Sequence, residues 1–278
     1  MQIFRALWVS LAVLLSAGLL IAPAHSDTGR RDEATESFVR GFVRFLAYHE
    51  AGHLLMGQIA NLNTHPDWSA ADREDYADKF ATILLQPDAD DPEGIDEIIS
   101  AVAGWLQVDT SILNNEPHAP PQDRAYDILC LVYGSDPGSF SLFEEVLDPS
   151  SDCTGLYQAM REEVDGIFKD YSGEMGHSVA IVYGPPSGGM DAARAFLIES
   201  NVAEDLKDDL EADFYLTHRT TIQAMSCTGK AKPDTFYFDT VRAQNPDDDH
   251  FVITLCYEMI DARLKYGMRG FEDEGEQN

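Results

Sequence analysis

Apolar residues recur at helical spacing over the stretch from Phe38 to Asn63. One stripe, with spacings of three and four residues, consists of Phe38, Phe42, Phe45, Leu46, His49, Gly52, His53 and Met56. The opposite side is apolar as well, which is typical of a helix packed on more than one side. The polar residues 27–36 before it predict a frayed start, with Thr35 or Ser37 as the N-cap.

Helical patterns continue through the first 172 residues. Ser69 and Asp72 form a capping-box pattern that opens a second helix, which runs to about Gln86 and ends before Pro87. An acidic linker over 88–94 follows it. Further helices are predicted over about 95–108, 122–133 and 155–171.

The character of the chain changes after residue 173. Short runs rich in β-branched and aromatic residues predict strands over 178–183, 221–227, 235–241 and 251–256, and a helical segment is expected over about 190–216. The acidic triplet 247–249 lacks the alternating ligands of a calcium loop, so we interpret it as a solvated turn. The pattern therefore predicts an α+β protein with a mainly helical N-terminal half and a small β-sheet contributed by the C-terminal half.

The N-terminus has the features of a signal peptide. Arg5 precedes an apolar run from Ala6 to Leu20, and small residues follow at Ala22 and Ala24. We expect cleavage within residues 1–26 and export to the periplasm or the exterior, with no stable membrane insertion afterwards. The alternative is an uncleaved membrane anchor, for which the apolar run is short compared with the about 20 residues of a spanning helix.

The cysteines and the net charge indicate disulfide bonds and exclude some classes of partner. In an oxidising compartment the four cysteines suggest two disulfides, and we favour the pairs that are near in sequence, Cys130 with Cys153 and Cys227 with Cys256; buried free thiols are the alternative. The formal net charge of −30 repels phosphate backbones and anionic lipid heads. Nucleic acid and membrane surfaces are therefore poor partners.

The run His49-Glu50-Ala51-Gly52-His53 is an H-E-x-x-H motif. On a helix, residues four apart share one face, so both imidazoles can bind one metal ion while Glu50 can reach a water beside it. The alternative is a pair of core histidines, but burying two imidazoles and a carboxylate without partners is costly. A single Zn²⁺ ion, which commonly takes nitrogen ligands at this spacing, resolves that cost.

The next helix carries a pattern that resembles a known signature. Glu74-Asp75-Tyr76-Ala77-Asp78 is similar to the E-x-x-A-D motif of gluzincin metallopeptidases. The resemblance implies a zincin-like fold in which Glu74 is the third zinc ligand and Asp78 orients a ligand histidine. Two alternatives stay open: a solvated acidic helix face, and His65 as the third ligand.

Longer segments resemble a bacterial family of exported metallopeptidases, the DUF4344 type. They are HEAGH, REDYADKFA and EPHAPPQDRAYDILCLVYGSDP, and in the C-terminal half SVAIVYGPP, SCTGKAKPDTFYFDT and ITLCYEMI. In that family a histidine stands at the place of His118, which implies a role toward the substrate or transition state, although an ordinary loop histidine fits as well. The family places the CYE segment before H-E-x-x-H, whereas in this chain it follows.

We interpret the inverted order as a circular permutation, in which the C-terminal half supplies the sheet for the zinc helix. Residues 258–266 should then lie close to 38–45. A dimer of two units and an altered gene boundary are the rival explanations. The expected organisation is a signal peptide over 1–26, a helical zinc-site region over 27–172, and an α/β region over 173–278 that packs on the zinc helix, the last two forming one catalytic domain.

Together these features predict a zinc metallopeptidase that hydrolyses a peptide or protein substrate. His49, His53 and Glu74 would hold the ion, and Glu50 would act as the general base. His118, Tyr126 and Tyr133 are candidates to stabilise the oxyanion. The alternatives are a non-catalytic zinc-containing binding or structural protein of the extracytoplasmic space, and a metal-free interaction domain.

Overall fold

The computed structural model of the protein describes residues 28–58, 68–107, 119–171, 176–227, 236–241 and 250–266. The elements are α2 (Thr28–Gln58), α3 (Ala70–Leu84), α4 (Pro92–Leu106), α5 (Pro121–Ser135), η1 (Ser141–Phe143), α6 (Cys153–Tyr171), β1 (Val179–Tyr183), α7 (Asp191–Glu199), α8 (Val202–Asp213), β2 (Arg219–Met225), β3 (Tyr237–Val241), β4 (His250–Cys256) and α9 (Tyr257–Tyr266). This order confirms the α+β class, with helices first and a small sheet in the second half.

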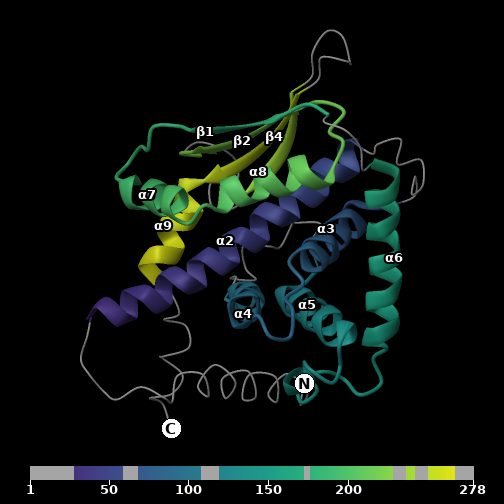
Figure 1. Ribbon diagram of the computed structural model, residues 1–278. Helices are drawn as coiled ribbons and strands as arrows, with labels where there is room; N and C mark the ends of the chain where they lie inside the picture. Colours follow the sequence, from purple (N-terminus) through teal and green to yellow (C-terminus); the bar gives the residue numbers. More distant parts are fainter. Residues whose placement is uncertain are drawn as a thin grey trace.

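Helix α2 runs through the middle of the molecule (Figure 1). It contacts α3 and α4 on one side and α8, α9, β3 and β4 on the other. Both sides are therefore buried, with Phe42 at 2% exposure and Val43 and Ala47 at 0%. The prediction of a helix packed on more than one side is confirmed. Within the described residues, no helix combines the length and the apolar composition needed to cross a membrane.

The predicted start of this helix was wrong. α2 begins at Thr28, so Thr35 and Ser37 lie inside the helix and neither is its N-cap. Residues 30–40 contain no proline or glycine, and the alanine, arginine and glutamate residues among them favour helix. Glu33, Ala34 and Glu36 are exposed, so the first turns extend the helix toward solvent without requiring an apolar face.

The second helix starts as its sequence predicts. Ser69 Oγ accepts a hydrogen bond from the Asp72 amide at 3.2 Å, and the Ser69 amide donates to Asp72 Oδ2 at 2.7 Å. These two bonds form the capping box and define the first turn of α3. Helix α4 begins earlier than expected, at Pro92, because Asp91 caps it by accepting from the Gly94 amide at 3.1 Å.

The sheet has four strands in the order β1-β2-β4-β3. β1, β2 and β4 are parallel, and β3 is antiparallel to β4. A parallel pair needs a crossover connection, and α7 and α8 provide it between β1 and β2. The helical segment expected over 190–216 is divided into these two helices at Asn201, whose backbone is left-handed with φ of 55°. The acidic triplet 247–249 lies outside the described residues.

Helix α9 lies against α2. The Arg263 guanidinium carbon is 4.8 Å from the centroid of the Phe42 ring. The proximity of residues 258–266 to 38–45, which a circular permutation requires, is therefore present. The domain boundaries at 27–172 and 173–278 stay a prediction, and helix α2 contacts elements of both segments.

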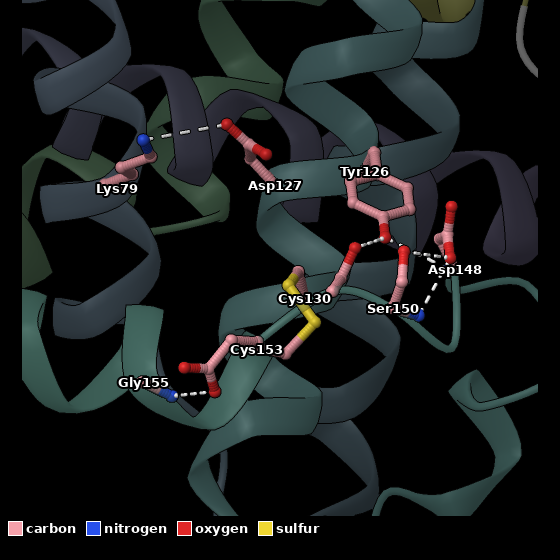
Figure 2. The surroundings of a disulfide bond; sticks show 10 residues. Lys79, Tyr126, Asp127, Cys130, Asp148, Ser150, Cys153 and Gly155 are labelled. Atoms are coloured by element: carbon pink, nitrogen blue, oxygen red, sulfur yellow. Dashed lines mark hydrogen bonds and ion pairs between the residues drawn. A yellow bond between two sulfur atoms is a disulfide. The ribbon is translucent and has the colours of Figure 1, made fainter.

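Both predicted disulfides are confirmed: Cys130 is bonded to Cys153, and Cys227 to Cys256. The first joins α5 to the start of α6 (Figure 2). The two helices touch closely there, since a Cβ on Gly134 would lie 2.1 Å from the Cys153 carbonyl oxygen. The second disulfide joins the segment after β2 to the end of β4. It therefore cross-links two neighbouring parallel strands at their C-terminal ends.

Removal of the Cys130–Cys153 bond should destabilise the protein without changing its fold. The bond spans 23 residues, and a loop of that length corresponds to about 3 kcal/mol of lost chain entropy in the unfolded state. We expect the C130A/C153A double variant to lose about that much free energy of unfolding in urea titration. Wild-type protein titrated under reducing conditions serves as the comparison, and an unchanged midpoint in both would contradict the prediction.

Candidate metal centre

Helices α2 and α3 approach each other closely at Gly52 and Ala77. A Cβ on Gly52 would lie 3.1 Å from Ala77 Cα and 3.3 Å from Ala77 Cβ, which is tighter than ordinary van der Waals contact. Small residues on both helices therefore let the backbones come together. His49 and His53 on α2 flank this contact, and Glu74 and Asp78 flank it on α3.

Three side-chain atoms converge between the two helices. His53 Nε2 lies 3.1 Å from His49 Nε2 and 3.1 Å from Glu74 Oε2, and the remaining distance, from His49 Nε2 to Glu74 Oε2, is 3.2 Å. Ligands about 2.0–2.2 Å from a tetrahedral zinc ion lie about 3.3–3.6 Å from one another. The triangle is a few tenths of an ångström smaller than that. His49, His53 and Glu74 form a group that could hold a metal ion.

The tautomer of His49 is set by Asp78. His49 Nδ1 lies 2.9 Å from Asp78 Oδ1, and both side chains are buried. An ionised carboxylate can only accept, so Nδ1 carries the hydrogen and, in the neutral ring, Nε2 presents its lone pair toward His53 and Glu74. Burial by itself would lower the pKa of His49, but the hydrogen bonds with Asp78 and Glu74 raise it to about 9. The surroundings of this imidazole therefore favour a positive charge, as a proton or as a metal cation.

Arg124 of α5 completes this chain of contacts. Its Nη2 donates to Asp78 Oδ1 at 2.7 Å and its Nε donates to Asp78 Oδ2. Arg124 and Asp78 are 4% and 3% exposed. Burial alone would raise the pKa of Asp78, but the charge of Arg124 and the bond with His49 hold it at about 2. Asp78 therefore stays an acceptor for His49 across the physiological pH range.

A comparison with models of protein families places the chain in a family. A family model, DUF4344, with the description "Putative metallopeptidase", matches residues 18–163, just over half of the 278 residues. The chain belongs to the DUF4344 family. Its description names a peptidase, which implies a metal ion and peptide or protein substrates. No curated protein and no solved structure matches the chain.

The region that matches DUF4344 contains the whole of the group just described. Residues 18–163 include both histidines of the motif, Glu74, Asp78, Arg124 and the first disulfide. The sheet and the C-terminal segments that resemble the same family lie beyond the matched region. The group that could hold a metal ion, together with Asp78 and Arg124, therefore comes from α2, α3 and α5 within the matched region.

Glu50 lies next to His49 on the inner surface of α2 and is 7% exposed. Its negative charge contributes to the raised pKa of His49, after the effects of burial, of the hydrogen bonds and of the Asp78 charge. The carboxylate is therefore near the imidazole that belongs to the metal-binding group. Its role as a base stays a prediction.

The structure brings the predicted ligands together with Asp78 but places Tyr126 in a different environment. The Tyr126 hydroxyl lies 2.6 Å from Ser151 Oγ and accepts a bond from the Asp148 amide at 3.0 Å (Figure 2). Tyr133 is half-buried against the apolar core. His118 and the alternative ligand His65 lie outside the described residues.

Arg124 was not among the residues predicted from sequence. It precedes Ile128 by one helical turn, so it shares the inward face of α5 that the apolar pattern indicates. A charged residue on such a face is the signal that could have revealed it, because a buried guanidinium needs an acidic partner. The pattern alone leaves open which carboxylate that is.

Removing the Arg124 charge should leave the buried Asp78 carboxylate without its guanidinium partner, with only part of its charge compensated by His49. We expect R124M to lower the free energy of unfolding by about 3–5 kcal/mol, as measured by urea titration of chelator-treated protein. The D78N/R124M double variant should lose less than the sum of the two single losses, because the pair acts as a unit.

The matched control for R124M is R44M. Arg44 pairs with Glu97 at 2.9 Å, but its side chain is 28% exposed. Solvent screens such a pair, so we expect a loss of about 1 kcal/mol or less from this substitution. Equal losses in R124M and R44M would show that burial of the Arg124–Asp78 pair has no special weight.

Proposed function

We propose that this DUF4344 member is an exported zinc-dependent metallopeptidase. In this proposal His49, His53 and Glu74 bind one Zn²⁺ ion and Glu50 is the general base. The observation that carries it is the convergence of two imidazole nitrogens and one carboxylate oxygen within 3.1–3.2 Å of each other. Two histidines and a glutamate are a recurrent ligand set of catalytic zinc.

The choice of zinc rests on the donor atoms and on their rigidity. Imidazole nitrogens suit zinc better than calcium or magnesium, which prefer oxygen. His49 and His53 lie one turn apart on α2, Glu74 meets them from α3, and Asp78 keeps His49 in the tautomer whose Nε2 lone pair can bind a metal ion. When bound, zinc supplies a Lewis acid that polarises the scissile carbonyl and makes a water molecule more acidic.

We propose that Glu50 transfers the proton during hydrolysis. It takes a proton from the attacking water and returns it to the nitrogen of the leaving amine, so the peptide bond breaks with no net change in Glu50. Its place directly after His49, on the same buried part of α2, supports this role. For the oxyanion, the two hydrogen bonds at the Tyr126 hydroxyl favour a structural role for that residue, and Tyr133 and His118 stay as candidates.

Export is the third part of the proposal. Disulfides persist mainly in oxidising compartments, and the chain forms two of them with all four cysteines. The signal-peptide pattern of residues 1–26 points the same way. Both observations support a periplasmic or secreted location.

The substitution Glu50→Gln tests the catalytic role. We expect E50Q to keep one zinc ion per chain and to lose at least about 100-fold in cleavage rate, since the amide cannot accept the proton. The measurement combines metal analysis with a peptide-library digest. E36Q is the matched control, because Glu36 lies on the same helix and is exposed.

Undiminished cleavage by E50Q would refute the proposed mechanism. Zinc bound by wild-type protein without any cleavage of the library would instead favour a non-catalytic zinc protein.

The third ligand can be tested on two adjacent carboxylates. We expect E74Q to weaken zinc binding by more than the about 100-fold that loss of an outer partner typically causes. D75N should bind zinc like the wild type, since Asp75 pairs with Lys79 at 2.7 Å and lies outside the ligand group. Zinc affinity is measured by competition with a chromophoric chelator. Loss of binding in H65A together with retention in E74Q would assign the third ligand to His65.

A further inference from the structure

A column of two aromatic rings between two arginine side chains extends from Arg124, the partner of Asp78, to α9. The Arg124 guanidinium carbon lies 3.5 Å from the centroid of the Trp105 ring. The Trp105 and Phe42 rings meet edge to face, with centroids 5.8 Å apart and an interplanar angle of 88°. Arg263 of α9 lies over the other aromatic ring, that of Phe42. The column thus joins α5, α4, α2 and α9.

Trp105 makes its contacts through its aromatic ring and not through its indole N–H. It is 8% exposed, and its indole Nε1 is buried with no hydrogen-bond partner in the part of the chain that the structure describes. A buried indole N–H usually finds an acceptor, so an unpaired one is unfavourable. What the indole provides is a large aromatic face for the guanidinium, the best such face among the side chains.

The neighbouring glycine shows how closely this part of the column is packed. A Cβ on Gly104 would lie 2.1 Å from Phe42 Cδ2, so a side chain at this position would displace the Phe42 ring. Glycine leaves the space in which Phe42 meets Trp105. The indole is therefore fixed on one side by Phe42, while its face carries Arg124.

A guanidinium is planar, so contacts to its edge and to its face restrain different motions. Arg124 uses its edge for both oxygens of Asp78, and its face lies on the indole. The edge contacts set the direction of the Asp78 carboxylate, and the face contact holds the guanidinium in that plane. Asp78 in turn accepts from His49 Nδ1. The orientation of a proposed metal ligand therefore depends on a stacked aromatic ring three contacts away.

We propose that Trp105 is a positioning residue of the metal centre, which acts through Arg124 and Asp78 on His49. This inference rests on the proposed function, because it takes His49, His53 and Glu74 as metal ligands. Among the described residues, the ring contacts of Trp105 are with Arg124 and Phe42, so its proposed effect on the metal ligands passes through Arg124. Its effect is on the strength and geometry of metal binding, and the Phe42–Arg263 contact extends that support to α9.

The test compares two substitutions at Trp105 in the full chain. W105L removes the aromatic face, and W105F retains a ring while breaking no hydrogen bond among the described residues. We expect W105L to weaken zinc binding about tenfold and W105F less than threefold, measured by competition with a chromophoric chelator. Substitution with Co²⁺ gives a second readout, since its visible absorption follows ligand geometry, and W105L should shift that spectrum.

The control F143L separates positioning from a general loss of stability. Phe143 is 1% exposed, lies in η1 and stacks on Phe140, and it is not one of the four side chains of the column. It should lower the free energy of unfolding while leaving zinc affinity unchanged. If F143L weakens zinc binding as much as W105L does, or if W105L binds zinc and Co²⁺ like the wild type, the inference is overturned.

R124K keeps the test decisive if W105L does not fold. Lysine retains the charge beside Asp78 but has no planar face to stack on the indole. We expect about a tenfold loss of zinc affinity, and wild-type affinity in R124K would overturn the inference.

Zinc binding without cleavage in the wild type would remove the proposed function and leave these comparisons valid. Zinc binding and cleavage in the wild type with no effect in W105L and R124K would remove the inference alone.

Discussion

The buried carboxylate of Asp78 is the charge around which the candidate metal site is organised. A carboxylate in an apolar interior requires compensation, and Arg124 and His49 supply it from two different helices. The same contacts fix the imidazole tautomer of a residue in the H-E-x-x-H motif. The Asp78 carboxylate thus links stability and chemistry, because the interactions that make its burial tolerable also orient His49.

This arrangement depends on the close approach of α2 and α3. The Gly52–Ala77 contact brings two pairs of residues, each one helical turn apart, onto facing surfaces. A Cβ at position 52 would lie only 3.1 Å from Ala77 Cα, so a larger residue there would press the two helices apart and change the distances between the imidazoles and Glu74. The small residues therefore determine the ligand geometry as directly as the ligands themselves do.

Helix α2 is also the element that both halves of the chain share. Its two apolar sides pack against the helices on one side and against the sheet, α8 and α9 on the other, so the C-terminal half covers the helix that carries the motif. The column from Arg124 through Trp105 and Phe42 to Arg263 passes through it. Membership in the DUF4344 family is established by the N-terminal half, whereas the packing of α2 depends on both.

Local patterns in the sequence determined a large part of this protein: the two-sided helix with its motif, the Ser69 capping box, the α+β class and the cysteine pairs. Each of these depends on residues close together in the chain, through helical periodicity, backbone capping or short loops. The start of α2 escaped prediction because weak propensities decide a solvent-exposed helix end. Only the tertiary structure decided that Arg124 is the partner of Asp78 and that Trp105 lies beneath it, because these contacts join helices whose relative placement no local pattern encodes.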